Sequence, residues 1–340
     1  MRVLAAVDKF RGTVTAVEAA RAVAEACSGL GHECVEMPMA DGGEGTLDVL
    51  GGANRLTVVE GPLGSPVEAA WRLTNGTAVI EMARASGLQL VGGAAGNDAL
   101  AASTIGTGQL IAAALDAGAQ RIVVCVGGSA TTDGGLGAVQ VLQGAPRLRE
   151  VDLIVACDVQ TLFVDAAEVF APQKGASPAH VQFLVTRLHG IADHYRDALG
   201  CDVRSLPGAG AAGGLAGGLA ALGAKLEPGF DLVANEVGFH SALAECDVVI
   251  TGEGRLDDTS FTGKVVGEVA RHAADCRASA HGTAPGSIAI CGSIDSAASS
   301  RATKLGLRTI GLFEVYGDDA LNQPMRCITH AAVSMLATSA

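Results

Sequence analysis

Aromatic residues are scarce in this chain: they make up 3 per cent of its 340 residues, and charged residues account for only 17 per cent. A hydrophobic core must therefore be built from alanine, valine, leucine and isoleucine, which is feasible because 49 per cent of the residues are hydrophobic. This composition, with only 10 prolines, argues against a disordered chain. At roughly 100 to 200 residues per domain, the length predicts two domains, each with its own core.

Signatures of several well-known functions are also missing. No block of lysine or arginine occurs, and the net charge of −13 argues against nucleic acid as a partner. The nine cysteines form no Cys-x-x-Cys pair and the eight histidines no His-x-x-x-His pair, so we expect no zinc site. A Gly-x-Ser-x-Gly elbow is absent, which argues against a Ser-His-Asp hydrolase.

Signals for membrane insertion or export are weak. The uncharged stretch 205–224 has G-x-x-x-G spacing, but it holds only four leucines among glycines and alanines and includes Pro207. The apolar run at the N-terminus meets Asp8 and Lys9 at once, so it is too short for a signal peptide. Scattered, unpaired cysteines suit reduced thiols. We therefore expect a cytoplasmic protein that does not span a membrane.

Glycine is the residue in excess: the chain has 46 glycines in 340 residues, a fraction about twice the usual ~7 per cent. Collagen is excluded because no Gly-X-Y period is present. Short apolar strands alternate with amphipathic segments, and the first helix begins at a capping box formed by Thr15 and Glu18. We expect strands at 2–7, 33–37, 55–60, 67–73, 78–82, 121–126, 152–156, 246–251 and 287–291, and helices at 108–117, 178–199 and 263–274.

This alternation predicts an α/β protein made of two α/β domains with largely parallel sheets. Residues 1–55 and 240–340 resemble simple parallel βα units, whereas 56–101 is rich in strands. We therefore predict a Rossmann-like domain formed by 1–55 plus 240–340, with a second α/β domain, 56–239, inserted in it.

Two glycine clusters in the first half of the chain carry polar side chains. In residues 41–46, exposed backbone N–H groups can hold an anion, and Asp41 or Glu44 can hold a metal ion or a substrate hydroxyl. Residues 127–137 follow a strand and combine five glycines with hydroxyl side chains, a pattern typical of a phosphate-binding loop, although the Gly-Lys-Ser/Thr of a P-loop is missing. For both segments, a plain glycine-rich turn is the alternative.

Two further clusters lie in the second half. Gly208, Gly210 and Gly213 form a G-x-G-x-x-G motif, with Asp231 eighteen residues further on, which is the spacing of a dinucleotide fingerprint. However, residues 202–206 make a poor strand, so an anion site is the safer inference and an NAD-dependent oxidoreductase the alternative. Residues 251–264 place mixed charges in one predicted loop, which suits a phosphate with a metal ion; a solvated loop is the alternative.

The glycine clusters belong to a longer series of motifs that follow one another along the chain. In order, the series is Asp8-x-Phe10-Arg-Gly-Thr13, Met39-Ala-Asp-Gly-Gly-Glu-Gly-Thr46, Gly61-Pro-Leu-Gly64, Ile80-Glu-Met-Ala83, Ala85-Ser-Gly-Leu88, Gly127-Gly-Ser-Ala-Thr-Thr-Asp-Gly-Gly135, Ala156-Cys-Asp158, Phe170-Ala-Pro-Gln-Lys-Gly-Ala176, Pro207-Gly-Ala-Gly-Ala-Ala-Gly-Gly214 and Ile250-Thr-Gly-Glu-Gly-Arg-Leu-Asp257. This series resembles the bacterial type I glycerate kinase family, and the resemblance covers nearly the whole chain.

The resemblance implies a kinase that uses ATP and Mg²⁺ to phosphorylate D-glycerate to 2-phosphoglycerate or 3-phosphoglycerate, with its active site in the cleft between two α/β domains. Such chemistry needs mainly positioning and charge neutralisation around the phosphates. A sugar-phosphate-binding regulator without turnover is a further alternative. The oligomeric state is open, a homodimer included.

The resemblance also suggests roles for individual residues. The predicted catalytic residues are Asp158 as general base, Asp41 and Lys174. Asp41 and Glu44 are the candidate Mg²⁺ ligands. The predicted substrate-binding residues are Asp8, Arg11, Gly42, Gly43, Glu44 and Arg255, with the Arg11 guanidinium matching the glycerate carboxylate. The predicted ATP-binding residues are Gly127, Gly128, Ser129, Thr131, Asp133, Gly208, Gly210, Gly213, Gly214 and Glu253.

The chain departs from the family pattern at a few positions. Lys9 and Arg11 stand where the family has serine and lysine, and Thr132 stands where it has asparagine. Residues 160–163 lack the usual Asn-Pro, and the stretch from Gly137 to Val151 is shortened. These changes leave open whether glycerate or a related hydroxy acid is the substrate.

Overall fold

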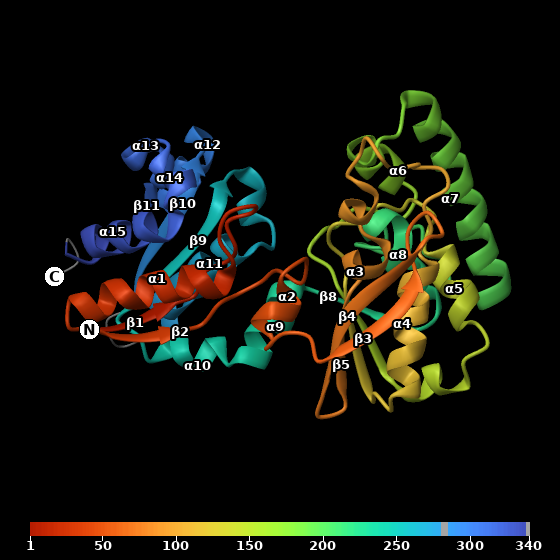
Figure 1. Cartoon of the computed structure of the whole chain (residues 1–340), viewed down its shortest axis with the longest axis horizontal. Coiled ribbons are helices and arrows are strands. Elements are labelled where there is room, and N and C mark those ends of the chain that lie inside the picture. The colour runs from red at the N-terminus through yellow and green to blue at the C-terminus, as the bar shows by residue number, and fades with distance from the viewer. Residues whose placement is uncertain (280–284, 338–340) are drawn as a thin grey trace. The chain divides into compact units, whose positions relative to one another are not determined.

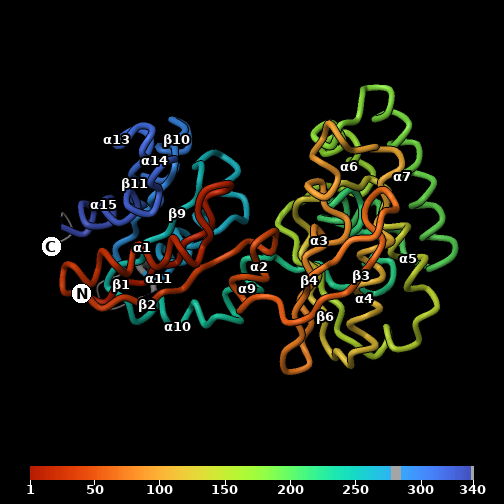
Figure 2. Tube along the Cα trace, viewed as in Figure 1, coloured from red at the N-terminus to blue at the C-terminus, as the bar shows by residue number. Residues whose placement is uncertain are grey.

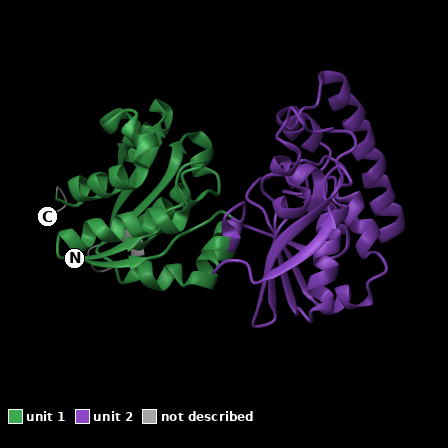
Figure 3. Cartoon of the chain, in the orientation of Figure 1, with its two compact units in different colours: residues 1–41, 48–50, 230–340 green, residues 42–47, 51–229 purple. Residues whose placement is uncertain are grey.

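A computed structural model of the chain describes residues 1–279 and 285–337. The chain forms two compact units (Figure 3). Unit 1 consists of Met1–Asp41, Asp48–Leu50 and Phe230–Ala340, and unit 2 of Gly42–Leu47 and Gly51–Gly229. The boundaries of these units differ from those of the predicted domains, which are 1–55 with 240–340 and 56–239.

Unit 1 is built on a five-stranded parallel sheet in the order β11-β10-β9-β1-β2 (Figure 1). Its strands are β1 (Arg2–Ala5), β2 (Glu33–Glu36), β9 (Val248–Leu256), β10 (Gly286–Ile294) and β11 (Leu307–Gly311). Its helices are α1 (Ala16–Gly29), α9 (Gly229–Val237), α10 (Phe239–Ala244), α11 (Val265–Ser279), α12 (Ser296–Lys304), α13 (Leu312–Tyr316), α14 (Asp319–Asn322) and α15 (Pro324–Ala337).

Helices cover both faces of this sheet. Both faces of β1 are therefore buried, which explains why its residues after Arg2 are all apolar. Val3 and Ala5 pack in one core with α1 and α15, whereas Leu4 packs on the opposite face with α9, α10 and α11. The alternation of side chains along a strand sends successive residues into these two cores. Because aromatic side chains are few, alanine fills much of the contact between α1 and the sheet.

Unit 2 contains a six-stranded mixed sheet in the order β3-β4-β5-β6-β7-β8, in which β5 to β8 are parallel. Its strands are β3 (Arg55–Glu60), β4 (Pro66–Thr74), β5 (Thr77–Glu81), β6 (Arg121–Cys125), β7 (Asp152–Ala156) and β8 (Lys225–Glu227). Its helices are α3 (Ala83–Ser86), α4 (Ile105–Asp116), α5 (Leu136–Leu142), α6 (Ala166–Phe170), α7 (Pro178–Leu199) and α8 (Leu215–Ala221), while α2 (Thr46–Val49) spans the border between the units.

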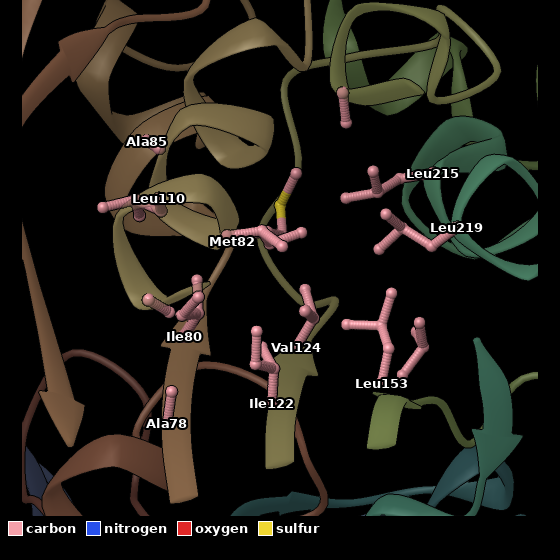
Figure 4. Close-up of a cluster of buried hydrophobic side chains, with 14 of the residues drawn as sticks. Ala78, Ile80, Met82, Ala85, Leu110, Ile122, Val124, Leu153, Leu215 and Leu219 are labelled. Atoms are coloured by element: carbon pink, nitrogen blue, oxygen red, sulfur yellow. The ribbon is translucent and has the colours of Figure 1, made fainter. Parts of the chain in front are cut away.

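The core of unit 2 lies between this sheet and helices α4, α5 and α8. Figure 4 shows Leu110 of α4 and Leu215 and Leu219 of α8 directed toward the strands. The strand residues that meet them are Ile80, Ile122, Val124 and Leu153. This packing holds the C-terminal ends of β5, β6 and β7 side by side, and the polar loops follow those ends along the chain (Figure 2).

The structure confirms the predicted fold class and the strongest local signals. The capping box is present: Glu18 N donates to Thr15 Oγ1 at 3.2 Å and Thr15 N to Glu18 Oε2 at 2.9 Å. The helix predicted at 178–199 is α7, with Ser177 as its N-cap and Gly200, in the left-handed region, at its C-terminal end. Capping residues therefore marked these boundaries reliably.

One predicted loop is wrong. Residues 252–256 were expected to form a loop after a strand, but β9 continues through Leu256, and β10 likewise runs on to Ile294 beside it. The glycines that suggested a loop serve close strand packing instead. A Cβ atom at Gly252 would collide with the carbonyl oxygen of Ile290, and one at Gly292 would collide with that of Gly254.

Candidate active site

Unit 1 contains a cavity of about 620 Å³ lined by both acidic and basic side chains. It lies where β1 and β9 end, which is the edge at which open parallel sheets bind ligands. Two apolar side chains, Phe313 and Leu321, complete one part of its wall. The charged side chains that line it are Asp8, Lys9, Arg11, Asp41, Glu253, Arg255, Asp257 and Lys264.

Asp8 and Glu253 are the two most deeply buried acids of this cavity, each only 7 per cent exposed. They come from neighbouring chain segments, because Asp8 N donates to the carbonyl oxygen of Gly252 at 2.9 Å. Burial raises the pKa of Asp8 to about 6, with Lys9 opposing the shift and Asp41 adding to it. Burial also raises the pKa of Glu253 to about 7, against the effects of Ser260 and Lys264.

The turn that bears Arg11 lies against β9 at Gly254. A Cβ atom added there would be 3.2 Å from Arg11 N, so glycine gives this turn room to approach the strand. The turn closes with hydrogen bonds from Phe10 N to Val14 O and from Thr13 N to Phe10 O, both 2.8 to 2.9 Å long. Arg11, Asp8 and Lys9 thereby reach the same cavity.

Arg255 and Lys264 have different surroundings. Arg255 is 65 per cent exposed and pairs with Asp295 at 3.0 Å. Lys264 stands directly before α11, and its Nζ donates to Thr259 Oγ1 at 2.8 Å. Asp257 Oδ1 accepts hydrogen bonds from the same threonine, at 2.8 Å from Thr259 N and 2.6 Å from its Oγ1. Lys264 belongs to the charged segment that the sequence predicts for a phosphate with a metal ion, and its position before a helix also favours anion binding.

In unit 2, the 42–46 loop depends on a residue that the sequence analysis gave no role. Glu81, at the end of β5, is almost fully buried, and its Oε1 accepts hydrogen bonds from Gly45 N at 2.8 Å and Leu47 N at 2.9 Å. Its other oxygen accepts from Arg84 Nε at 3.0 Å. An acid ending an apolar strand was the signal available in the sequence.

Gly42 of the same loop is required by packing. Its φ is +79°, and a Cβ atom there would lie 2.6 Å from Gly229 Cα and 2.8 Å from Ala156 Cβ. The predicted general base lies beside this contact: Asp158 follows β7, is half-buried, and accepts a hydrogen bond from Gly229 N on Oδ1 at 2.8 Å. Gly229 thus packs against Gly42 and donates a hydrogen bond to Asp158.

Two of the predicted phosphate loops pack directly on each other. Gly134 N donates to Gly213 O at 3.0 Å. Gly213 has φ +68°, and a Cβ atom there would collide with Thr131 O. A Cβ atom at Gly214 would lie 2.7 Å from Gly134 Cα, and one at Gly210 would collide with Leu162 O. Gly213 and Gly214 are therefore required for the two loops to fit together, and Gly210 is required for the fit against residues 161–162.

Hydroxyl groups link the same loops. Ser129 Oγ and Thr131 Oγ1 are 3.0 Å apart, and each is 3.4 Å from the carbonyl oxygen of Ala212. Ala212 itself has φ +53°, a left-handed conformation that is unfavourable for a residue with a side chain. Strain of this kind persists where the surroundings enforce it and is concentrated at functional sites.

Lys174 lies inside this loop cluster. It is 3 per cent exposed, and its Nζ donates to Thr131 O at 2.6 Å and to Ser129 Oγ at 3.4 Å. Burial lowers its pKa to about 7, while Asp133 acts in the opposite direction. Asp133 holds the loop from the other side, accepting hydrogen bonds from Thr104 N and Oγ1 at 2.9 and 2.8 Å and from Gly135 N at 3.1 Å.

Comparison with known proteins assigns the chain to a family. The model of the glycerate kinase family matches residues 3–145 and 138–337, which together make up most of the chain. This chain belongs to the glycerate kinase family. The predicted family and the predicted enzyme class, a kinase, are thereby confirmed.

Individual relatives in the glycerate kinase family agree. The chain is 42 per cent identical to a glycerate kinase of Halalkalibacterium halodurans, over 80 per cent of this chain and 82 per cent of that protein. It is 39 per cent identical to a glycerate 2-kinase of Escherichia coli, over 78 and 80 per cent of the two chains. A solved structure from Salmonella typhimurium LT2, described as a glycerate kinase 2, superposes with a TM-score of 0.82 at 33 per cent identity, covering 99 and 98 per cent.

The two family-model matches meet at residues 138–145, within the stretch that the sequence shows as shortened. The structure closes this stretch compactly. Helix α5 ends at Leu142, and a short 3₁₀ turn, Pro146–Glu150, leads directly into β7. The shortened segment therefore leaves β7, and Asp158 two residues after it, in an ordinary strand-and-loop arrangement.

The dinucleotide interpretation of the 208–214 segment is not supported. The fingerprint requires a strand immediately before its first glycine, but residues 200–207 contain no strand and Gly208 follows only turns. Residues 211–214 form a short 3₁₀ turn before α8. The glycines of this segment pack against residues 131–134 and 161–163 instead.

Two predictions about metals and membranes can be compared with the structure. Among residues 1–279 and 285–337, no three or more His, Cys, Asp or Glu side chains come together as a metal site. Asp41, one candidate Mg²⁺ ligand, belongs to unit 1 and Glu44, the other, to unit 2. In the same described residues, no helix has the length and apolar character needed to cross a membrane.

Proposed function

We propose that this member of the glycerate kinase family transfers the γ-phosphoryl group of ATP directly to a hydroxyl of D-glycerate, forming 2-phosphoglycerate. The observation that carries the proposal is the cavity of unit 1, where acids and cations line one space in a chain of this family. The name of the E. coli relative, a glycerate 2-kinase, supports O2 over O3 as the acceptor.

The cavity of unit 1 offers the groups that glycerate needs. Glycerate has one carboxylate and two hydroxyls, so it calls for a cation beside hydrogen-bond acceptors. Arg11 supplies a planar guanidinium for the carboxylate, and Asp8 supplies an acceptor for a hydroxyl. Arg255 would contribute less, because it is largely exposed and already paired with Asp295.

The loop cluster of unit 2 offers a place for the phosphates of ATP. Gly127 and Gly128 follow β6 and can bring backbone N–H groups to a phosphate. Gly210 N and Gly214 N already donate to carbonyl oxygens, and the Ser129 and Thr131 hydroxyls hydrogen-bond each other, so these groups would have to exchange partners to bind a phosphate. Lys174 would act mainly by holding Thr131 and Ser129 in position, because its Nζ is buried among them. Asp133 would likewise position the loop, since its oxygens are occupied by backbone and hydroxyl donors.

Mg²⁺ fits this chain through few protein ligands. Magnesium commonly binds one or two carboxylates together with substrate phosphates and water, so a three-carboxylate cluster is not required. Asp41 and Glu44 have the oxygen donors that such a site uses. When bound, the ion neutralises charge that develops on the phosphates during transfer.

Asp158 is the proposed general base. The hydrogen bond from Gly229 N to its Oδ1 holds the carboxylate in place after β7. The ionised carboxylate would accept the proton of the glycerate hydroxyl as that oxygen attacks the γ-phosphorus. The phosphorus–oxygen bond to the β-phosphate breaks, and ADP leaves.

Phosphorus NMR of a reaction with D-glycerate, ATP and Mg²⁺ tests the proposal. We expect ADP to appear together with 2-phosphoglycerate, whose resonance differs from that of 3-phosphoglycerate. Appearance of 3-phosphoglycerate would correct the acceptor oxygen only. A protein that binds D-glycerate without releasing ADP would be a regulator rather than a kinase, and a thermal shift with NAD but none with MgATP would favour the oxidoreductase.

A further inference from the structure

One carboxylate oxygen in the unit 1 cavity has no protein partner. Glu253 lies in β9, lines the cavity and is 93 per cent buried, yet its Oε1 makes no hydrogen bond with any residue that the structure describes. Buried polar atoms are normally paired, and an unpaired buried carboxylate oxygen is costly. Because the Glu253 side chain lines a cavity, a ligand bound in that cavity is the candidate partner for this oxygen.

The groups around Glu253 define what this ligand must be. The charged or titratable side chains that act on it are Asp8 after β1, Asp257 and Lys264 at the two ends of the segment that follows β9, and Cys291 on β10. The Ser260 side chain opposes the rise in the pKa of this carboxyl group. Lys9, Arg11 and Asp41 line the same cavity.

We propose that Glu253 Oε1 accepts a hydrogen bond from a hydroxyl of the hydroxy-acid substrate and so makes the cavity specific for that hydroxyl. The inference rests on the proposed function for the identity of the substrate. It changes the role predicted for Glu253 from ATP binding to substrate specificity.

A hydroxyl fits this position better than the other ligand classes. An anionic group at this position would be repelled by the carboxylates of Glu253, Asp8 and Asp257. Glu253 lies in β9, Asp257 directly follows β9, and Asp8 follows β1. Among the described residues no three or more His, Cys, Asp or Glu side chains come together, so a metal ion held by protein groups alone is not favoured at Glu253. A hydroxyl donates one hydrogen bond, brings no charge, and leaves the substrate carboxylate to Arg11.

The ionised carboxylate is a stronger acceptor than the neutral acid, so a hydrogen bond from the hydroxyl favours the ionised form. Because burial raises the pKa of Glu253 to about 7, the site without substrate is largely protonated below neutral pH, and we expect it to release a proton when the hydroxyl donates to it. At pH 6.5 this predicts a release of roughly 0.7 proton per D-glycerate bound, and close to none at pH 8.5. Asp8, with a pKa of about 6, can add at most roughly 0.25 proton at pH 6.5.

Calorimetry of D-glycerate binding to the full chain, with and without a non-hydrolysable ATP analogue and Mg²⁺, measures this release. Titrations in two buffers of different ionisation enthalpy at pH 6.5 give the number of protons. We expect E253Q to release fewer than roughly 0.3 proton, because glutamine does not titrate. E25Q, which alters an exposed glutamate of α1, should behave like the wild type.

Substrate analogues then identify the hydroxyl. D-lactate lacks the 3-hydroxyl of glycerate and 3-hydroxypropionate lacks the 2-hydroxyl. We expect one of them to bind at least about tenfold more weakly than D-glycerate to the wild type at pH 8, and this ratio to fall toward one in E253M, whose side chain is of similar size but accepts no strong hydrogen bond.

The inference fails if E253Q releases as many protons as the wild type, if E253M keeps the discrimination, or if folded wild-type protein binds no D-glycerate under either condition. These results are separable from the proposed function, which is judged by ADP release. Glycerate binding with proton release but without ADP formation would overturn the proposed function alone. Turnover with no effect of E253Q on proton release or of E253M on analogue discrimination would overturn the inference alone.

Discussion

Burial of Glu253 should make the protein less stable at alkaline pH. The folded-state pKa of about 7 lies above the ordinary value of 4.5, so folding favours the protonated acid. The resulting destabilisation is absent below about pH 4.5, grows as pH rises, and is complete above about pH 7. A shift of this size corresponds to about 3 kcal/mol, as an order of magnitude.

We therefore expect E253Q to be more stable than the wild type at pH 8 and to lose this advantage by pH 5. Urea unfolding at the two pH values measures the difference in the free energy of unfolding. E25Q should leave the stability unchanged at both. Equal stability of E253Q and the wild type at pH 8 would contradict this prediction. It would mean that other groups offset the cost of burying the ionised carboxylate.

Asp158 gives a prediction about catalysis. Asparagine at this position keeps the size of the side chain and an oxygen that can accept from Gly229 N, but it cannot take up a proton. We expect D158N to fold normally and bind MgATP like the wild type, while kcat falls by roughly 10² to 10⁴.

Asp152, at the other end of β7, supplies the matched control. It is paired with Lys225 at 2.6 Å on the surface, so D152N should retain wild-type turnover. Coupled assays of ADP release compare the two variants. Wild-type turnover in D158N would exclude Asp158 as the base and direct attention to the acids of unit 1.

At the scale of elements, the contact between the two glycine loops of unit 2 gives a prediction about stability and ATP binding. G213A would place an alanine at φ +68° and push its Cβ against Thr131 O. We expect a loss of at least about 2 kcal/mol in the free energy of unfolding. The KM for ATP should rise as well, because Thr131 belongs to the proposed phosphate loop.

Gly190 is the control for this substitution. It lies within α7 in the same unit, has no positive φ, and an added Cβ would meet nothing within 4 Å. Alanine is a better helix former, so G190A should stabilise the protein by up to about 1 kcal/mol and leave the KM for ATP unchanged. Equal effects of the two substitutions would show that the loop contact does not matter.

The same elements show where sequence reasoning succeeds and where it fails. The start of α1 and both ends of α7 were predictable because Thr15, Ser177 and Gly200 act locally. The extent of β9 was not, because Gly252 indicates a loop to any local rule, and only its partner β10 shows that glycine is there for close strand contact. Long-range contacts of this kind leave no signal within a short segment.

At the scale of the whole molecule, the motifs of the candidate site could be recognised in the sequence, but the contacts of their side chains could not. Lys174 was predicted to be catalytic, and its burial against Thr131 and Ser129 supports our proposal that it positions the loop. Glu81 was overlooked because its task, holding the backbone of residues 45–47, depends on a contact 34 to 36 residues away in the chain. Spacing along a sequence cannot reveal such partners.

The proposed binding of one ligand to each unit gives a prediction for the entire chain. If unit 1 holds the hydroxy acid and unit 2 the nucleotide, each ligand should protect different backbone amides from hydrogen exchange. D-glycerate should slow exchange at residues 8–13 and 252–264, and a non-hydrolysable ATP analogue with Mg²⁺ should slow it at 127–135 and 208–214. Mass spectrometry of peptides from each ligand-bound state measures this. The opposite pattern would reverse the assignment of the two sites, because Arg11 and Lys264 would then bind phosphates and the Ser129 loop would bind glycerate.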